Sequence, residues 1–218
     1  MARRFELIVF DWDGTLMDSA ALIVSSVQAA ARDLGLPPPS DERARHIIGL
    51  GLIDALRHAL PDLEASRYQE VAVRYRHHYL SRDHELVLFD GVPELIGELA
   101  QAEYRLGVAT GKSRVGLDRA LGDSGLGTYF HATRCADECH SKPHPQMLEE
   151  LMDEFGVAPE ATLMIGDTTH DLLMAKNAGV AALAVAYGAH PREQLEAESP
   201  LHCAGSIDEM AAWLRANA

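Results

Sequence analysis

LIVFDWDGTLMDS, residues 7–19, is a run of four apolar residues followed by two aspartates, Asp11 and Asp13, with one residue between them. Burying an unpaired carboxylate costs several kcal/mol. The buried strand expected over residues 5–10 therefore ends where the acids begin, and both carboxylates emerge at its carboxyl end.

Short apolar runs of strand length recur along the chain, at 5–10, 104–110, 161–166 and 181–186. Between them lie stretches with helical spacing, such as the one that starts near Pro145 and ends at Gly156, and the one from Pro93 to Ala102. Continuous apolar runs are typical of strands buried on both faces. The alternation of strand and helix predicts an α/β fold with a doubly wound parallel sheet.

The region from residue 20 to residue 82 contains no expected strand. Apolar residues recur there at helical spacing in three sets, interrupted by the PPPS break at 37–40. The sets are Ile23, Val27, Ala30 and Leu34; Ile48, Leu52, Leu56 and Leu60; and Tyr68, Val71, Tyr75 and Tyr79. We expect an α-helical cap at 18–85, inserted into a Rossmann-like core formed by 1–17 and 86–218, with linkers at 17–20 and 83–88.

Charge and cysteine content narrow the class of protein. The 33 acidic and 19 basic residues give a net charge of −14, which disfavours binding to nucleic acid or to an anionic membrane. Cys135, Cys139 and Cys203 are too few for a disulfide framework, and no second ligand pair follows Cys139 and His140 to complete a metal site. No apolar run is long enough for a secretory leader or a membrane span. We expect a cytoplasmic protein, as a monomer or weak dimer.

Polar residues follow the predicted strands at the edge where parallel sheets bind ligands. They are Asp11, Asp13, Thr110, Gly111, Asp167 and Asp171, with Lys142 contributed by the HSKPHP segment. Clustered carboxylates repel each other unless a hard cation binds them, and Mg²⁺ binds through carboxylates and substrate phosphate. A lysine and a threonine hydroxyl beside that cation would bind phosphate oxygens. The set predicts phosphoryl transfer.

Residue types suggest individual roles. An aspartate is unprotonated at neutral pH, so Asp11, which is aimed by the strand, can accept the phosphoryl group without a separate base. Asp13, on a turn that Gly14 makes possible, can protonate the leaving oxygen and then deprotonate the attacking water. The paired acids are therefore interpreted as nucleophile and general acid/base.

DWDGT, VATGK, SKPHP and GDTTHD, in this order, resemble the motifs of the haloacid dehalogenase-like superfamily of phosphatases, and specifically its phosphoglycolate phosphatase-like group with a helical cap. The resemblance covers essentially the whole chain. It implies a mobile cap, Mg²⁺ and an aspartyl-phosphate on Asp11, with Asp13 as acid/base and its backbone carbonyl on the metal. It further implies that Thr110 and Lys142, together with Gly111, bind the phosphoryl group. Asp167 would bind metal, and Asp171 would orient the lysine or a metal-bound water.

Less specific interpretations stay open for several of these residues. Asp11 and Asp13 could be a helix cap and a turn residue, and Thr110 a plain helix cap. TGKS at 110–113 lacks the glycine that a Walker A loop needs, because Leu106 occupies that place. His144 and His170 are ambiguous. In the cap, Arg45, His46 and Arg57 are candidates to contact a second anionic group of the substrate. Charged residues of this kind more often lie on a solvent-exposed face without a ligand.

The leading hypothesis is a Mg²⁺-dependent phosphatase of small phosphorylated metabolites, including phosphoglycolate, sugar phosphates, nucleoside monophosphates and pyrophosphate. A sugar-phosphate mutase, a pyrophosphatase of the same fold and a phosphate-binding module without turnover are the alternatives. Substrate contacts are expected in the cap, where the sequence says least.

Overall fold

The computed structural model describes residues 4–218, so the first three residues of the predicted core lie outside it. Within these residues a parallel sheet of six strands has the order β3-β2-β1-β4-β5-β6. The strands are β1 (Leu7–Phe10), β2 (Arg105–Thr110), β3 (Ala132–Cys135), β4 (Thr162–Gly166), β5 (Ala181–Val185) and β6 (Cys203–Ala204). This is the strand order of a doubly wound α/β fold, which confirms the predicted fold class.

Strand β1 lies at the centre of the sheet and is buried on both faces. Leu7 pairs with Arg105 of β2 on one side and with Thr162 of β4 on the other. Because side chains alternate along a strand, Ile8 and Phe10 belong to one hydrophobic cluster, while Leu7 and Val9 belong to the cluster on the opposite face. The run LIVF therefore has no polar position.

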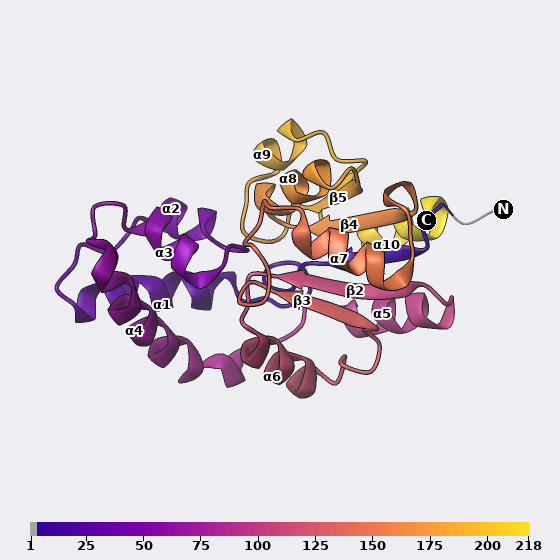
Figure 1. Cartoon of the computed structure of the whole chain (residues 1–218). Helices are drawn as coiled ribbons and strands as arrows, with labels where there is room; N and C mark the ends of the chain where they lie inside the picture. The colour runs from indigo at the N-terminus through magenta and orange to yellow at the C-terminus, as the bar shows by residue number, and fades with distance from the viewer. Residues whose placement is uncertain (1–3) are drawn as a thin grey trace.

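Helices cover both faces of the sheet (Figure 1). One face packs against α5 (Val92–Gln101), α6 (Arg114–Ser124) and α10 (Ile207–Asn217). The other packs against α7 (Gln146–Phe155) and α8 (Thr169–Asn177), with α9 (Arg192–Ala197) beside α8. Short 3₁₀ turns lie at Ala65–Arg67, Asp83–Glu85 and Pro159–Ala161. The helices predicted from Pro93 and from Pro145 to Gly156 are confirmed as α5 and α7.

Two strands were not predicted. Strand β3 has the sequence ATRC and lies at the sheet edge, where Thr133 and Arg134 remain partly exposed and interrupt any apolar run. Strand β6 at the opposite edge has only two residues. Edge strands need no continuous apolar pattern, because one side of the strand has no neighbour to bury it.

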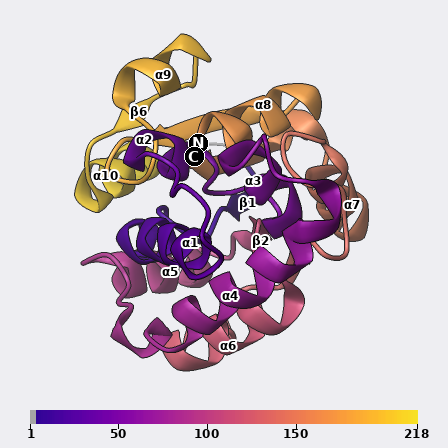
Figure 2. The same ribbon diagram turned by 90° about the vertical axis from the view of Figure 1, so that its left-hand side faces the viewer.

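A separate helical group lies beyond the carboxyl ends of the strands and is joined to β1 (Figures 1 and 2). It consists of α1 (Ala20–Asp33), α2 (Asp41–His46), α3 (Leu52–Ala59) and α4 (Tyr68–Leu80). Helices α1, α3 and α4 pack around one hydrophobic cluster, and Ala44 of α2 belongs to a second, smaller cluster with α1 and Ala189. The expected helix through Ile48, Leu52, Leu56 and Leu60 was wrong at its start. Ile48 lies in the connecting segment 47–51, because Gly49 has a φ of +90° and Gly51 caps α3.

The two predicted linkers between this group and the core lie side by side. Asp18 N–H donates to the Val87 carbonyl, and Phe89 N–H donates to the Leu16 carbonyl. Helix α1 begins at Ala20, inside the first predicted linker, and the turn Asp83–Glu85 lies inside the second. The division into core and cap stays a prediction. In the described part of the chain, none of the helices has the length and apolar character needed to span a membrane.

Candidate active site

The sequence-predicted site residues gather at the carboxyl ends of β1, β2 and β4. Asp11 continues β1, and its N–H donates to the Ile165 carbonyl of β4 at 2.9 Å. Thr110 ends β2, and Asp167 follows β4 directly. Asp11, Asp13, Thr110, Lys142, Asp167 and Asp171 are all buried. Charged groups are rarely buried without partners, so their partners define the site.

Lys142 is the central cation of this cluster. Its Nζ lies 2.7 Å from Oδ1 of Asp11 and 2.6 Å from Oδ1 of Asp171. The other oxygen of Asp171 accepts from the Thr168 N–H and from the Thr168 hydroxyl. The Asp171 N–H donates to the same hydroxyl, which completes a capping box at the start of α8. Burial opposes the charge of Lys142, but the two carboxylates outweigh it and hold the pKa of Lys142 above its ordinary value. Lys142 is therefore a fixed positive charge.

The positive charges and hydrogen-bond donors around Asp11 and Asp167 do not offset the cost of burying their ionised carboxylates. Burial raises the pKa of Asp11 to about 7, although Lys142 opposes the rise. Burial, together with the charges of Asp11 and Asp171, raises the pKa of Asp167 well above its ordinary value. Within residues 4–218, Oδ2 of Asp11 has no hydrogen-bond partner. A positive charge placed beside these oxygens would stabilise both ionised carboxylates.

The residues fit a divalent cation. Oxygen atoms of Asp11, Asp167 and Asp171 lie within 4.8 Å of one another, and carboxylate oxygens are the ligands that Mg²⁺ prefers. The carboxylate of Asp167 is held in place by the Thr15 hydroxyl, 3.0 Å from Oδ1, and by the Ala189 N–H, 2.7 Å from Oδ2. Four buried carboxylates face two ammonium groups here, so two positive charges would balance the site.

The carboxylate of Asp13 is separate from this cluster. Both of its oxygens lie 2.9 Å from Nζ of Lys112, and the Ser19 hydroxyl donates to Oδ1 at 2.7 Å. Nζ of Lys112 also donates to the hydroxyl of Tyr79 on α4, at 2.9 Å. Asp13 is thus linked through one lysine to the helical group.

Gly111, which follows Thr110, lies against the segment 47–51 of the helical group. The Thr110 hydroxyl accepts from the Lys112 N–H at 3.3 Å. A Cβ on Gly111 would lie 2.6 Å from the Gly49 carbonyl oxygen and 2.5 Å from that of Leu50, so only glycine fits. The Gly51 N–H donates to the Ser141 hydroxyl at 2.8 Å, next to Lys142.

Three histidines join the helical group to the core nearby. Nε2 of His170 and of His190 both donate to the backbone carbonyl of His46, at 2.7 and 3.2 Å. Nδ1 of His190 accepts from the Thr169 N–H, so the proton of this neutral ring is on Nε2. Nε2 of His190 therefore has no lone pair for a metal, although the three rings could otherwise provide ligands. The cluster acts as a hydrogen-bonded clamp.

The remaining predicted candidates lie outside the carboxylate cluster. His144 packs on His140, with ring centroids 4.4 Å apart. Arg57 forms an exposed ion pair with Asp54. Arg45 and His46 line a cavity of about 530 Å³ between α2 and the segment 189–194. Cys135 and Cys203 are buried, Cys139 is partly buried, and none of the three joins a disulfide or a candidate metal cluster within the described residues.

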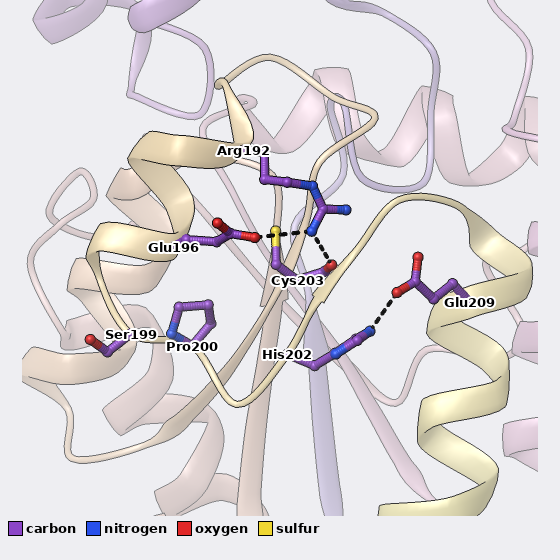
Figure 3. Close-up of a pocket in the computed structure, with 7 residues that line it drawn as sticks. All are labelled: Arg192, Glu196, Ser199, Pro200, His202, Cys203 and Glu209. Carbon is purple, nitrogen blue, oxygen red and sulfur yellow. Dashed lines mark hydrogen bonds and ion pairs between the residues drawn. The ribbon is translucent and has the colours of Figure 1, made fainter.

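Another cavity, of about 300 Å³, lies beside β6 and away from the carboxylates (Figure 3). Its charged groups already satisfy one another. Nη1 of Arg192 donates to Glu196 and to the Cys203 carbonyl, and His202 contacts Glu209 at 2.8 Å. This cavity offers no uncompensated charge for a substrate.

Two of the residues that complete the site had no predicted role. Lys112 and Thr15 both follow predicted strands at the ligand-binding edge, in VATGK and DWDGT, but neither was assigned a function. Lys112 is two residues beyond Thr110, at the same sheet edge, and that position was the available signal. The partner of Thr15, Asp167, is 152 residues away in sequence, and nothing in the local pattern indicates this pairing.

The sequence and the fold of the chain were compared with those of known proteins, and the matches are hydrolases. The profile described as "Haloacid dehalogenase-like hydrolase" matches residues 8–185. The chain is 40% identical to the "Probable phosphatase IndB" of Dickeya dadantii, over 89% of this chain and 86% of that protein. It is 34% identical to a 5′-nucleotidase of Pseudomonas aeruginosa, over 92% and 91%. A crystal structure of a predicted phosphoglycolate phosphatase from Haemophilus somnus superposes with a TM-score of 0.87 at 24% identity, covering 97% of this chain and 99% of that one.

Proposed function

Because the chain belongs to the haloacid dehalogenase-like hydrolase family, we propose that it is a Mg²⁺-dependent phosphatase of small phosphate monoesters that forms an aspartyl-phosphate on Asp11. The names of its relatives support a phosphatase. The observation that carries the proposal is Asp11, whose Oδ1 is bound by Lys142 while its buried Oδ2 has no partner among residues 4–218.

In the first step a carboxylate oxygen of Asp11 forms a bond to phosphorus as the bond to the leaving oxygen breaks. Lys142 and the Thr110 hydroxyl bind the phosphoryl oxygens, where negative charge is concentrated. Protonated Asp13 gives its proton to the leaving alcohol. The products of this step are the free alcohol and phosphorylated Asp11.

In the second step Asp13, now ionised, removes a proton from a water molecule that attacks phosphorus. The bond from phosphorus to Asp11 breaks, which releases phosphate and restores the Asp11 carboxylate. One residue thus serves as acid and then as base. Its pairing with Ser19 and Lys112 fixes the direction of its carboxylate.

Asp11, Asp167 and the backbone carbonyl of Asp13 are the groups that would hold Mg²⁺, with Asp171 orienting Lys142. The cation supplies charge neutralisation, which lets a phosphate dianion approach a site with four carboxylates. Asp167 is held by Thr15 and Ala189, and Asp171 by Thr168.

The helical group would act as a mobile cap. Its segment 47–51 lies against Gly111 and Ser141, so substrate entry requires this segment to move away. Its return would exclude bulk water while the phosphoryl group is transferred.

The test is phosphate release from a panel of phosphorylated metabolites, with Mg²⁺ or with a chelator, for the wild type, Asp11→Asn and the exposed control Asp153→Asn. We expect Mg²⁺-dependent release that Asp11→Asn abolishes and Asp153→Asn retains. Release that persists in Asp11→Asn would contradict the nucleophile. Isomerisation of a sugar phosphate without free phosphate would instead indicate a mutase.

A further inference from the structure

Two of the three lysines of the chain lie at the site, and only Lys142 has been assigned a contact with the transferred phosphoryl group. The second, Lys112, has a side chain that is 10% exposed. Its ammonium group has three N–H donors, and these face Asp13 Oδ1, Asp13 Oδ2 and the Tyr79 hydroxyl, each at 2.9 Å. Burial opposes the charge of Lys112, but Asp13 outweighs burial and keeps the pKa of Lys112 above its ordinary value.

The position of Lys112 relative to the reaction follows from its partner. Lys142 contacts the carboxylate that would attack phosphorus, whereas Lys112 contacts the carboxylate that would protonate the leaving oxygen. In the proposed reaction Asp13 approaches the leaving oxygen, so a group that is hydrogen-bonded to Asp13 would lie nearer to the alcohol part of the substrate than to the transferred phosphoryl group. Among the described residues, Lys112 is the half-buried cation that contacts Asp13.

Tyr79 brings a second polar group from α4 to the same place. Because its hydroxyl oxygen accepts from Lys112, its own proton points elsewhere, and no hydrogen bond from it to another described residue is present. The ring of Tyr79 stacks on Tyr75, with centroids 5.7 Å apart, and lies 5.0 Å from Nζ of Lys112. One positive charge and one hydroxyl donor thus converge beside Asp13.

We propose that Lys112 and Tyr79 form a subsite for a negatively charged group on the leaving alcohol, so that the preferred substrates are phosphate monoesters whose alcohol carries a carboxylate or a second phosphate near the ester oxygen. This inference rests on the proposed function. Hydrogen bonds to an anion are stronger than those to a neutral hydroxyl. An arriving anion would therefore replace Tyr79 as the third partner of Lys112, and Tyr79 would donate its proton to the same anion.

The experiment compares three substrates that share a two-carbon alcohol: phosphoglycolate, ethylene glycol bisphosphate and hydroxyethyl phosphate. The first two carry a carboxylate or a second phosphate, and the third is neutral at that position. For the wild type we expect kcat/KM to be at least about tenfold higher for one of the anionic substrates than for hydroxyethyl phosphate. The anionic substrate that is favoured identifies the group.

Lys112→Met should lower kcat/KM for the favoured anionic substrate by about 100-fold, and by clearly less for hydroxyethyl phosphate, so that the preference disappears. Lys112→Arg, which keeps the charge, should retain part of the preference. Tyr79→Phe should weaken it by about fivefold. Lys176→Met, at an exposed position on α8, is the matched control and should leave all three values unchanged.

If Lys112 only holds Asp13 in place, Lys112→Met will slow all three substrates by the same factor, which would overturn the inference. Equal wild-type rates on charged and neutral alcohols would also overturn it, while leaving the phosphatase function intact. A wild type that releases no phosphate from any monoester with Mg²⁺ would remove the proposed function and this inference together. Inhibition of nitrophenyl phosphate hydrolysis by glycolate, present in the wild type and lost in Lys112→Met, provides a readout that is independent of turnover of the anionic substrates.

Discussion

Nζ of Lys142 lies 2.7 Å from Oδ1 of Asp11, and neither side chain is exposed to solvent, although the two residues are 131 positions apart in sequence. The same ammonium contacts Asp171 at 2.6 Å. One cation therefore holds together the carboxyl end of β1, the segment before α7 and the start of α8. The side chains proposed to take part in the reaction are therefore also the ones whose ion pairs stabilise this edge of the sheet.

Lys142→Met should destabilise the metal-free protein by about 3 to 5 kcal/mol, because it leaves Asp11 and Asp171 buried without their cation. Urea unfolding in the presence of a chelator measures this loss. Lys176→Met, which removes an exposed lysine, should change the free energy of unfolding by less than about 0.5 kcal/mol. Equal effects of the two substitutions would contradict the buried ion pair.

Asp13→Asn should separate the two steps of the reaction. Turnover of an alkyl phosphate is expected to fall by about 100-fold or more, since its leaving group needs a proton. Nitrophenolate leaves without one, so nitrophenyl phosphate should give a rapid burst of about one nitrophenolate per enzyme, followed by slow turnover. Stopped-flow absorbance measures the burst. Its absence, with equal losses on both substrates, would exclude Asp13 as acid/base.

Mg²⁺ should raise the melting temperature of the wild type, because a ligand that binds only the folded state stabilises it. Asp167→Asn removes one carboxylate of the candidate cation site and should reduce this rise, which thermal unfolding with and without Mg²⁺ measures. The metal-free variant should unfold no more easily than the wild type, since Asp167 is buried beside Asp11 and Asp171, which have the same charge. An undiminished Mg²⁺ effect would place the cation elsewhere.

Gly111→Ala should impair activity through the cap rather than through the core. The added Cβ would lie 2.5 Å from the Leu50 carbonyl oxygen, so the segment 47–51 has to move outward. We expect kcat/KM to fall by at least about tenfold, as a small misplacement of a closing element is costly. Gly122→Ala on α6 is the control: its Cβ meets nothing within 4 Å, and it should leave activity unchanged.

Stability should fall as the pH drops below about 6.5, in part through His190. Burial, followed by the charge of His170, lowers the pKa of His190 to about 4, whereas an unfolded histidine titrates near 6.5. Between these values the unfolded state binds more protons, so folding loses about 3 kcal/mol through this group between pH 7 and pH 4. The difference in unfolding free energy between the wild type and His190→Gln should shift by that amount in favour of the variant.

The centre of the fold could be predicted from the sequence because its signals are local. Strand β1 is a continuous apolar run, and α7 is bounded by Pro145 and Gly156. Strand β3 could not be predicted, because an edge strand with a Thr-Arg pair carries no apolar pattern. The start of α3 was misplaced because helical spacing continued through Ile48, while the conformation of Gly49 ended the helix.

In the candidate site too, the residues with local sequence signals could be predicted, and the contacts between distant segments could not. The residues that follow the strands gather at one edge, as parallel sheets require, and this property places Asp11, Thr110 and Asp167 together. Pairings between distant segments could not be predicted. The contact of Lys112 with Tyr79 of α4 and the clamp of His170 on the His46 carbonyl depend on how the helical group is seated on the core.

Besides the Tyr79 hydroxyl, that seating uses main-chain atoms on the side of the helical group. The His46 carbonyl accepts from two core histidines, the Gly49 and Leu50 carbonyls lie over Gly111, and the Gly51 N–H donates to Ser141. Main-chain carbonyls are the same for every amino acid, and every residue except proline has the N–H. Most side chains of α2, α3 and α4 can therefore diverge during evolution without altering these main-chain contacts, so one mode of seating on the core is compatible with many different surfaces on the helical group.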